Sequence, residues 1–233
     1  PALVEVEEGV FYTNHWAGLV DFVSYLHEEG FGLSEGTAAV IDMDKTALGA
    51  RGRNDGAIDK ARVEAVQLTV EEVLGEEFRL KESRTVYDEL NQPQYHPFTG
   101  DNQDYLAYIS LMLSAGVYDF EEFLSRLSAG KLASLPQFVA LCGERLKAMP
   151  ASGLSRVQAE VEGNLAGGDP TPFKSFRYRE YHTTVARMVD RSMGEDLSAI
   201  LRENIVPTQE VMDLARYLSE RGVLLFSISD KPD

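Results

Sequence analysis

Apolar positions three and four residues apart dominate the chain and predict helices. The first such pattern runs through residues 15–30 and ends at Gly30, a helix stop signal. Its apolar face is formed by Trp16, Leu19, Phe22, Val23 and Leu26. From about residue 56 to residue 204 the helical pattern returns in seven segments, separated by breaks that contain Gly, Pro and Asn. No fixed period links these segments, so we expect a helical module of about 150 residues rather than a repeat solenoid.

Two short apolar runs lack the helical period and predict β-strands. They are "AAVID" at residues 38–42 and "VLLFSIS" at residues 223–229. Uninterrupted apolar runs of this length are typical of strands that are buried on both faces of a parallel sheet. The second run follows a helical pattern that starts at Pro207 and stops at Gly222. We therefore expect one α/β layer, interrupted by the helical module, to which residues 3–13 can add an edge strand.

Composition and charge narrow the classes of function. The chain of 233 residues has 22 basic and 38 acidic side chains, and its net charge of −16 repels nucleic acid and anionic membranes. No apolar run approaches the roughly 20 residues that cross a bilayer, and the N-terminal segment is acidic, so we predict a cytoplasmic protein. The single cysteine, Cys142, excludes a disulfide and lies in an apolar run, which predicts a buried, inert thiol. We predict surface or capping roles for His15 and His27.

Asp42 and Asp44 stand at the carboxyl end of the first predicted strand, where α/β sheets bind ligands. An ionised aspartate can attack a phosphoryl group, and its neighbour can exchange a proton with the leaving group and with water. A calcium loop is excluded, because Ala47 stands where its sixth position needs Gly and Arg53 where its twelfth needs Glu. A chance acidic turn stays open, since the spacing Asp-x-Asp-x-Thr is expected in about 3 per cent of chains of this length.

Two segments resemble the motifs of one known family. "VIDMDKT" resembles the first motif of the haloacid dehalogenase-like (HAD) hydrolase superfamily, an apolar strand that ends in Asp-x-Asp-x-Thr/Val. "VPTQEVMDLARYLSERGVLLFSISDKPD" resembles the helix and strand of the second motif, where a Ser or Thr ends an apolar strand. The resemblance implies an α/β fold: a HAD-like Rossmannoid core, whose parallel sheet is incomplete in this chain, with a large all-α cap inserted between the two motifs.

The resemblance also implies roles for individual residues. Asp42 would be the nucleophile and a ligand of Mg²⁺, and Asp44 would be the general acid/base, with its backbone carbonyl on the metal. Thr46 would support the turn, and Ser229 would hydrogen-bond the transferring phosphoryl group, with Ser227 as the alternative register. An aspartate at the second position indicates phosphate esters, because an alcohol leaving group needs a proton and a halide does not.

The same resemblance divides the chain into a core of residues 1–49 and 204–233 and a helical cap of residues 50–203. Caps close over the site, exclude water and select substrates. Several cations and one histidine are candidate substrate contacts, although each can equally be solvated or lie over a core. They are Arg51, Arg53, Arg177, Arg179 and His182. Lys231 is a candidate phosphate ligand or, alternatively, a solvent-facing loop residue.

The family's third motif, a Lys or Arg, and its fourth, an acidic pair, follow the second motif, whereas this chain ends at Asp233. We therefore expect the sequence to be part of a longer protein. The preferred function is a Mg²⁺-dependent phosphomonoester hydrolase that acts on a small phosphorylated substrate through an aspartyl-phosphate on Asp42, with phosphotransfer open within the same class. The alternative from another class is a non-catalytic helical binding protein on a degenerate or truncated HAD scaffold. Oligomeric state does not follow from the sequence.

Overall fold

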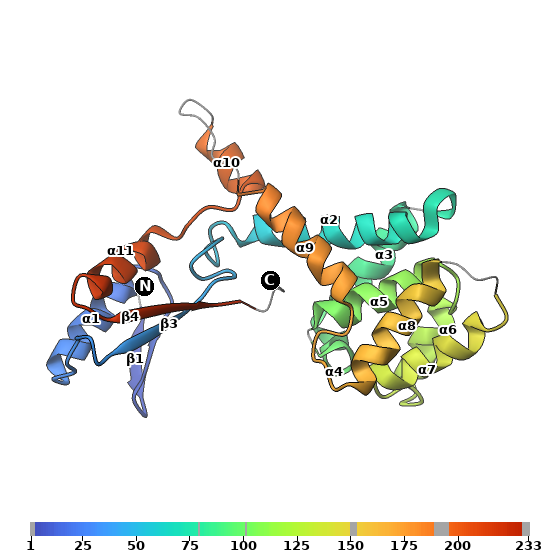
Figure 1. Cartoon of the computed structure of the whole chain (residues 1–233), viewed down its shortest axis with the longest axis horizontal. Coiled ribbons are helices and arrows are strands. Elements are labelled where there is room, and N and C mark those ends of the chain that lie inside the picture. The colour runs from blue at the N-terminus through green and yellow to red at the C-terminus, as the bar shows by residue number, and fades with distance from the viewer. Residues whose placement is uncertain (1–2, 79, 101, 150–152, 189–195, 230–233) are drawn as a thin grey trace. The chain divides into compact units, whose positions relative to one another are not determined.

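The computed structural model of the chain describes residues 3–78, 80–100, 102–149, 153–188 and 196–229. These residues divide into two compact units (Figure 1). The sheet unit comprises described residues of 3–60 and 184–229, and the helical unit comprises those of 61–183. Both boundaries of the sheet unit therefore lie inside the segment 50–203 that the resemblance assigns to a cap.

The described residues of the sheet unit form two separate two-stranded sheets. In one, strands β1 (Val4–Glu7) and β2 (Val10–Thr13) pair in antiparallel orientation. In the other, strands β3 (Ala38–Asp42) and β4 (Leu224–Ile228) pair in parallel. The predicted α/β class, with a parallel pairing of the two apolar runs, is therefore confirmed.

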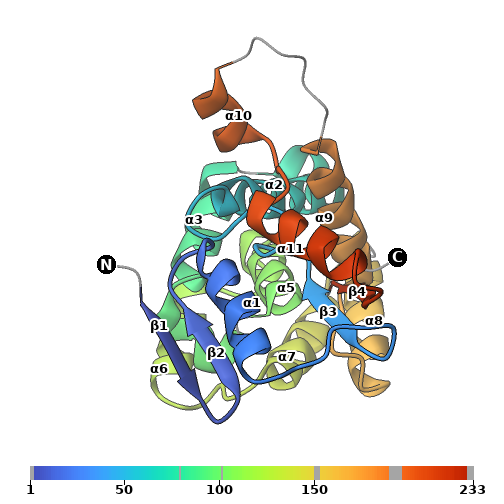
Figure 2. The same ribbon diagram turned by 90° about the vertical axis from the view of Figure 1, so that its left-hand side faces the viewer.

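Residues 3–13 form a hairpin of their own, so the prediction that they extend the parallel sheet is wrong. Glu8 and Gly9 both have positive φ angles, 50° and 80°, as in the two-residue turn whose twist suits a hairpin. The ring centroid of Phe11 lies 5.5 Å from that of Phe22 in helix α1 (Gly18–Glu28). The hairpin is positioned by this packing on α1, rather than by pairing with β3 (Figure 2).

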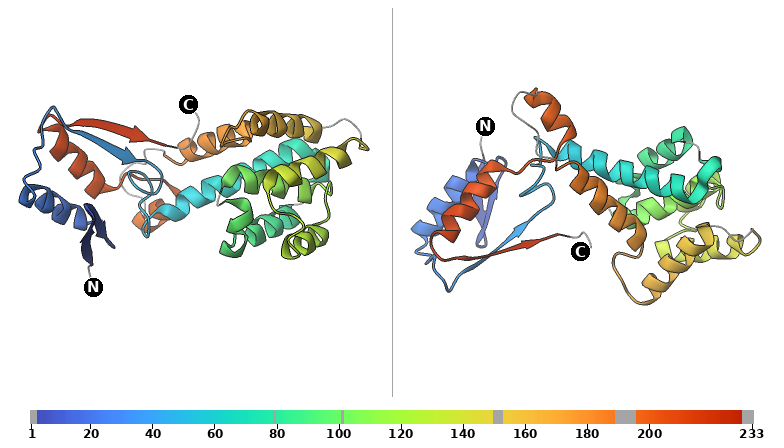
Figure 3. Two further views of the ribbon diagram at one scale, coloured as in Figure 1. Left: turned by 90° about the horizontal axis from the view of Figure 1, so that it is seen from below. Right: turned by 45° about the horizontal axis from the view of Figure 1, so that its top comes forward.

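Within the described residues of the sheet unit, the parallel pair is covered on one face. Helices α1 and α11 (Gln209–Ser219) lie on the same side of it (Figure 3). Val40 pairs with Phe226, and because side chains alternate along a strand, both lie on one face, where Val40 is 61% exposed and Phe226 55%. The prediction of strands buried on both faces is wrong, because only two strands pair in the described part of the chain and the helices cover one side.

Helices build the helical unit, and each of the seven predicted segments overlaps a helix. Helices α2 (Asp55–Leu74) and α9 (Lys174–Ala186) span its boundaries with the sheet unit, which itself contains α10 (Leu197–Glu203). The others are α3 (Leu80–Leu90), α4 (His96–Thr99), α5 (Gln103–Ser114), α6 (Phe120–Ser128), α7 (Leu135–Leu146) and α8 (Gly153–Ala166). The sequence pattern misses α3, whose buried apolar residues all lie in its second half. Over the described residues, no helix has both the length and the apolar character needed to cross a membrane.

Aromatic rings fill the centre of the helical unit. The ring centroid of Phe138 lies 5.2 Å from that of Phe123, 5.4 Å from Tyr118 and 6.2 Å from Tyr108. Cys142 is fully buried in the same core, and burial raises the pKa of its thiol to about 12. A thiol with a raised pKa is rarely ionised at neutral pH. The predicted burial of Cys142 is therefore confirmed, and its inertness stays a prediction.

A buried ionic network joins the N-terminus of α5 to α9. Arg177 forms ion pairs with two carboxylates. Its Nε atom is 3.3 Å from Oδ2 of Asp104, and its Nη1 atom is 2.6 Å from Oε2 of Glu180. Glu180 is also paired with Arg62, at 2.9 Å. Arg177, Asp104 and Glu180 are almost fully buried, and the N–H of Phe173 donates to Asp104 at 3.0 Å. These contacts supply the partners that buried charges require.

The pKa of Asp104 gives a pH-dependent stability. Burial raises this pKa from 3.8 to about 6, although the charge of Arg177 opposes the rise. Between about pH 4 and pH 6 the folded chain therefore binds a proton that the unfolded chain does not bind. The stabilisation of the folded state by this proton is fully present below about pH 4 and is lost as the pH rises through about 6. We expect the free energy of unfolding of the wild type, relative to Asp104→Asn, to fall by up to about 3 kcal/mol over this range. Urea unfolding followed by circular dichroism measures it, and parallel pH profiles for the two proteins would refute the expectation.

Candidate functional site

Asp42 is the last residue of β3, and the chain after it folds back sharply. Lys45 has a left-handed φ of 59°, which residues other than glycine rarely adopt. Because of this turn, the N–H of Ala47 returns to the carbonyl of Asp42, at 3.2 Å. The predicted residues Asp42, Asp44 and Thr46 are thereby held in one short loop at the carboxyl end of the strand.

Thr46 orients the carboxylate of Asp42. Its Oγ1 donates a hydrogen bond of 2.7 Å to Oδ2 of Asp42. Thr46 is itself held by Thr208, whose hydroxyl donates to the Thr46 carbonyl. The N–H of Thr208 also donates to the carbonyl of Ala47, at 2.8 Å. The segment before α11 therefore fixes the turn, and the turn fixes one oxygen of the candidate nucleophile.

Asn54 and Gly49 fix the rest of the loop. Asn54 is buried, its Nδ2 donates to the carbonyl of Asn204 at 2.8 Å, and its Oδ1 accepts from the N–H of Val206 at 2.9 Å. Gly49 has a φ of 65°, and a Cβ there would lie 2.4 Å from the Cδ1 of Ile58, so only glycine fits. These contacts tie the loop to the segment between α10 and α11, about 150 positions away in sequence.

The second predicted motif ends beside the first. Ile228, the last residue of β4, pairs with Asp42, and its carbonyl accepts a hydrogen bond of 3.0 Å from the next N–H of the β3 chain. Ser229 follows directly and so stands level with the loop. Ser227 lies one step inside the ladder, opposite Ile41. This placement favours Ser229 over Ser227 as the phosphate ligand.

A hollow of about 530 Å³ adjoins the loop. It is lined by residues 13–16, 19, 45–46 and 51–53. Arg53 forms two hydrogen bonds with Glu210, of 2.9 and 2.7 Å, and this pairing lowers the pKa of the Glu210 carboxyl. Arg51 is exposed. The two arginines that the sequence selects near the loop therefore both line one hollow, although a carboxylate already engages one of them.

Sequence reasoning missed two other residues of this hollow. The indole N–H of Trp16 donates to the carbonyl of Arg51, 35 positions later, at 3.0 Å. The Nε2 atom of His15 is buried and has no hydrogen-bond partner among the described residues, while the residue as a whole is half-buried. Its carbonyl accepts from the N–H of Gly18, the first residue of α1, at 3.1 Å, and the surface or capping role of His15 stays a prediction. His27, by contrast, is exposed as predicted and contacts the hydroxyl of Tyr217 at 2.7 Å. No local pattern reveals the contact between Trp16 and Arg51, because it joins separate loops.

The other predicted substrate contacts lie on α9. Arg177 is a member of the buried ionic network. Arg179 pairs with Glu72 and donates to the carbonyl of Leu68 at 3.3 Å. The ring of His182 lies 4.5 Å from that of Tyr178. Each of these contacts is made within the helical unit. Lys231 lies outside the residues that the structure describes.

Two oxygen atoms of the loop are candidate ligands of a Mg²⁺ ion. This ion prefers oxygen ligands, keeps several waters and usually takes only one or two carboxylates from a protein. The Asp42 carboxylate and the Asp44 carbonyl would supply that set. Over the residues described, no group of three or more His, Cys, Asp or Glu side chains gathers that could hold a metal ion.

The candidate roles of these residues rest on the two sequence motifs and on the geometry of the loop. Comparison of the chain with protein-family models, with curated proteins and with solved structures gives no match.

Proposed function

We propose that the protein is a Mg²⁺-dependent phosphomonoester hydrolase of the HAD type, with the sheet unit as its core and the helical unit as its cap. The observation that carries this proposal is the hydrogen bond of 2.7 Å from Thr46 to Asp42, at the end of a parallel strand whose neighbour ends level with it. A nucleophile must be oriented before it can attack, and this hydrogen bond orients one. Ser229, directly after the neighbouring strand, supports the same reading because a hydroxyl there can bind a phosphoryl oxygen.

The proposed reaction has two steps. The carboxylate of Asp42 attacks the phosphorus of a small phosphate ester, while Asp44, protonated, gives its proton to the leaving alcohol. Water then attacks the phosphorus of the aspartyl-phosphate and gives a proton back to Asp44, which releases phosphate and restores both carboxyl groups. When bound, Mg²⁺ would offset the negative charge that otherwise repels the phosphate from the carboxylate.

Hydrolysis of a simple phosphate ester tests the proposal. We expect the purified protein to hydrolyse p-nitrophenyl phosphate in the presence of Mg²⁺, and its rate to fall at least about a hundredfold when EDTA removes the ion, since the charge of the phosphate is then no longer offset. Readdition of Mg²⁺ should restore the rate. Absence of hydrolysis with Mg²⁺, or an equal rate in EDTA, would exclude this function.

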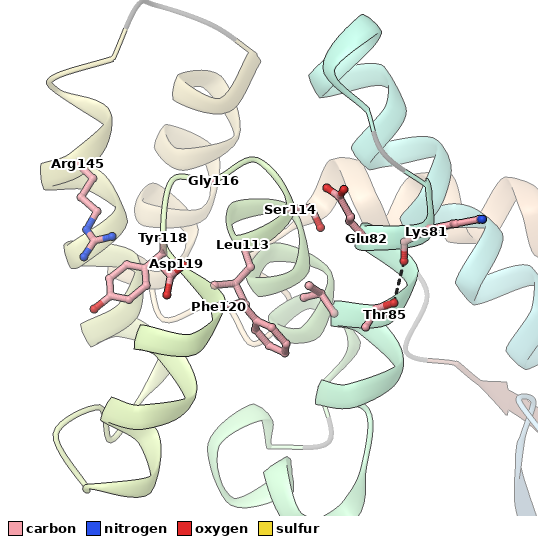
Figure 4. A pocket seen from close by; sticks show the side chains of 11 residues that line it. Lys81, Glu82, Thr85, Leu113, Ser114, Gly116, Tyr118, Asp119, Phe120 and Arg145 are labelled. Carbon is pink, nitrogen blue, oxygen red and sulfur yellow. Dashed lines mark hydrogen bonds between the residues drawn. The ribbon is translucent and has the colours of Figure 1, made fainter.

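A second candidate, a non-catalytic binding protein, has one observation in its favour. The helical unit has a hollow of about 570 Å³ of its own, between α3, the end of α5 and α7 (Figure 4). Leu113 and Phe120 line it, but Arg145 at its rim is engaged with Glu122, at 2.8 Å, and lies over the ring of Tyr118. Ligand binding that persists when Mg²⁺-dependent hydrolysis is absent would favour this candidate.

A further inference from the structure

The hollow beside the Asp42 loop is lined by several cations, although the chain as a whole is acidic. Three of its lining side chains are cationic, namely those of Lys45, Arg51 and Arg53, and none is acidic. The chain as a whole has a net charge of −16. Cations that line a hollow attract anions only as far as nearby carboxylates do not already neutralise them. All lining residues belong to the sheet unit, as does Asp42.

Arg51 is the cation of this hollow that remains available to a ligand. Lys45 is paired with Asp59, at 2.8 Å, and Arg53 with Glu210, at 2.7 Å. Arg51 has no carboxylate partner within the described part of the chain, while its backbone is held by the indole of Trp16 and by the carbonyl of Lys45. A fixed backbone and an unpaired guanidinium suit the two-pronged hydrogen bonding of a carboxylate or phosphate.

His15 also lines the hollow, next to Trp16. Its Nε2 atom is buried, and no described residue hydrogen-bonds to it. Because this nitrogen has almost no accessible surface, it does not face the hollow, and Arg51 is the group that a ligand there can reach.

Thr46 connects the hollow to the candidate nucleophile. Its side chain lines the hollow and donates to Asp42 at 2.7 Å. We propose that the hollow binds a second oxyanion of the phosphate-ester substrate, either a carboxylate or a second phosphate, through Arg51. The substrate class is then a phosphate ester with another anionic group near the ester, and this inference rests on the proposed function.

Binding of matched phosphonates tests the inference without requiring catalysis. The probes are 3-phosphonopropionate, ethylene-1,2-bisphosphonate and propylphosphonate, which lacks the second oxyanion. By isothermal titration calorimetry with Mg²⁺ present, we expect at least one of the first two to bind about tenfold or more tightly than propylphosphonate, because a charged hydrogen bond is gained. The tighter of the two identifies the second group as a carboxylate or a phosphate.

Two arginine variants decide whether Arg51 is responsible. In Arg51→Ala, the ratio between the dissociation constants of propylphosphonate and of the tighter probe should fall close to one. Arg156→Ala removes an equal charge from an exposed position on α8 and should leave this ratio unchanged. Equal binding of all three probes by the wild type, or equal losses in both variants, would overturn the inference. If a probe with two oxyanions binds more tightly than propylphosphonate but no Mg²⁺-dependent hydrolysis occurs, the proposed function is refuted and the oxyanion site is not. Hydrolysis without a preference would refute the oxyanion site alone.

Discussion

Asp42→Asn is expected to lower the kcat/KM of Mg²⁺-dependent phosphate-ester hydrolysis by at least about a thousandfold, because an amide cannot form the aspartyl-phosphate. The fold should survive, since the amide oxygen can still accept the hydrogen bond that Thr46 donates to the carboxylate. Phosphate release measures the loss. Acid quenching with ³²P-labelled substrate should leave label on the wild-type protein and none on the variant.

A second aspartate of the sheet unit provides the control for this experiment. Asp21 lies in the first turn of α1 and is exposed, so Asp21→Asn removes the same charge away from the loop. This variant should keep wild-type activity within about twofold, because surface substitutions away from special features have small effects. If Asp42→Asn kept more than a tenth of the wild-type rate, Asp42 would not be the nucleophile.

Arg177→Met is expected to destabilise the helical unit by about 3–5 kcal/mol. The substitution would leave two buried carboxylates, those of Asp104 and Glu180, without the cation that lies 3.3 Å from one and 2.6 Å from the other. Arg62, which is paired with Glu180 at 2.9 Å, would compensate for only one of them. Urea unfolding followed by circular dichroism at 222 nm measures the change.

An exposed ion pair provides the matched control for Arg177. Arg84 and Asp88 are 2.7 Å apart on α3, with side chains 46% and 52% exposed. Arg84→Met should cost about 1 kcal/mol or less, because water solvates both groups when the pair is broken. Similar losses of stability in the two variants would show that the buried network contributes no more than a surface pair.

Local sequence patterns were sufficient for most elements of the fold. The helical periods predicted α1, α2 and α5–α11, and the apolar runs predicted β3 and β4, because periodicity reports which side of an element meets a core. The runs alone do not set the register: Asp42, the polar end of the first run, pairs with Ile228, one residue before Ser229, the polar end of the second run. The pattern failed for α3, whose first half is polar apart from Leu80, and for the single turn of α4.

Contacts between distant segments were beyond reach of such patterns. A hairpin of residues 3–13 could equally pair with β3 or pack on α1, and the rings of Phe11 and Phe22 decide between them. Burial of Arg177 likewise depends on Asp104, which lies 73 positions earlier in the chain (177 − 104). Nothing near Arg177 in the sequence reveals a partner at that separation.

The sequence by itself determined most of the helices, the strands β3 and β4, the burial of Cys142, and the carboxylate pair of Asp42 and Asp44 after a strand, because each depends on neighbours within a few residues. Only the tertiary structure decided that Thr46 orients Asp42, that one face of the β3–β4 pair is open within the described sheet unit, and that His15 and Arg51 line one hollow. These features arise where loops far apart in the chain meet, and burial and hydrogen bonding at such meetings are set by the packing of the whole unit.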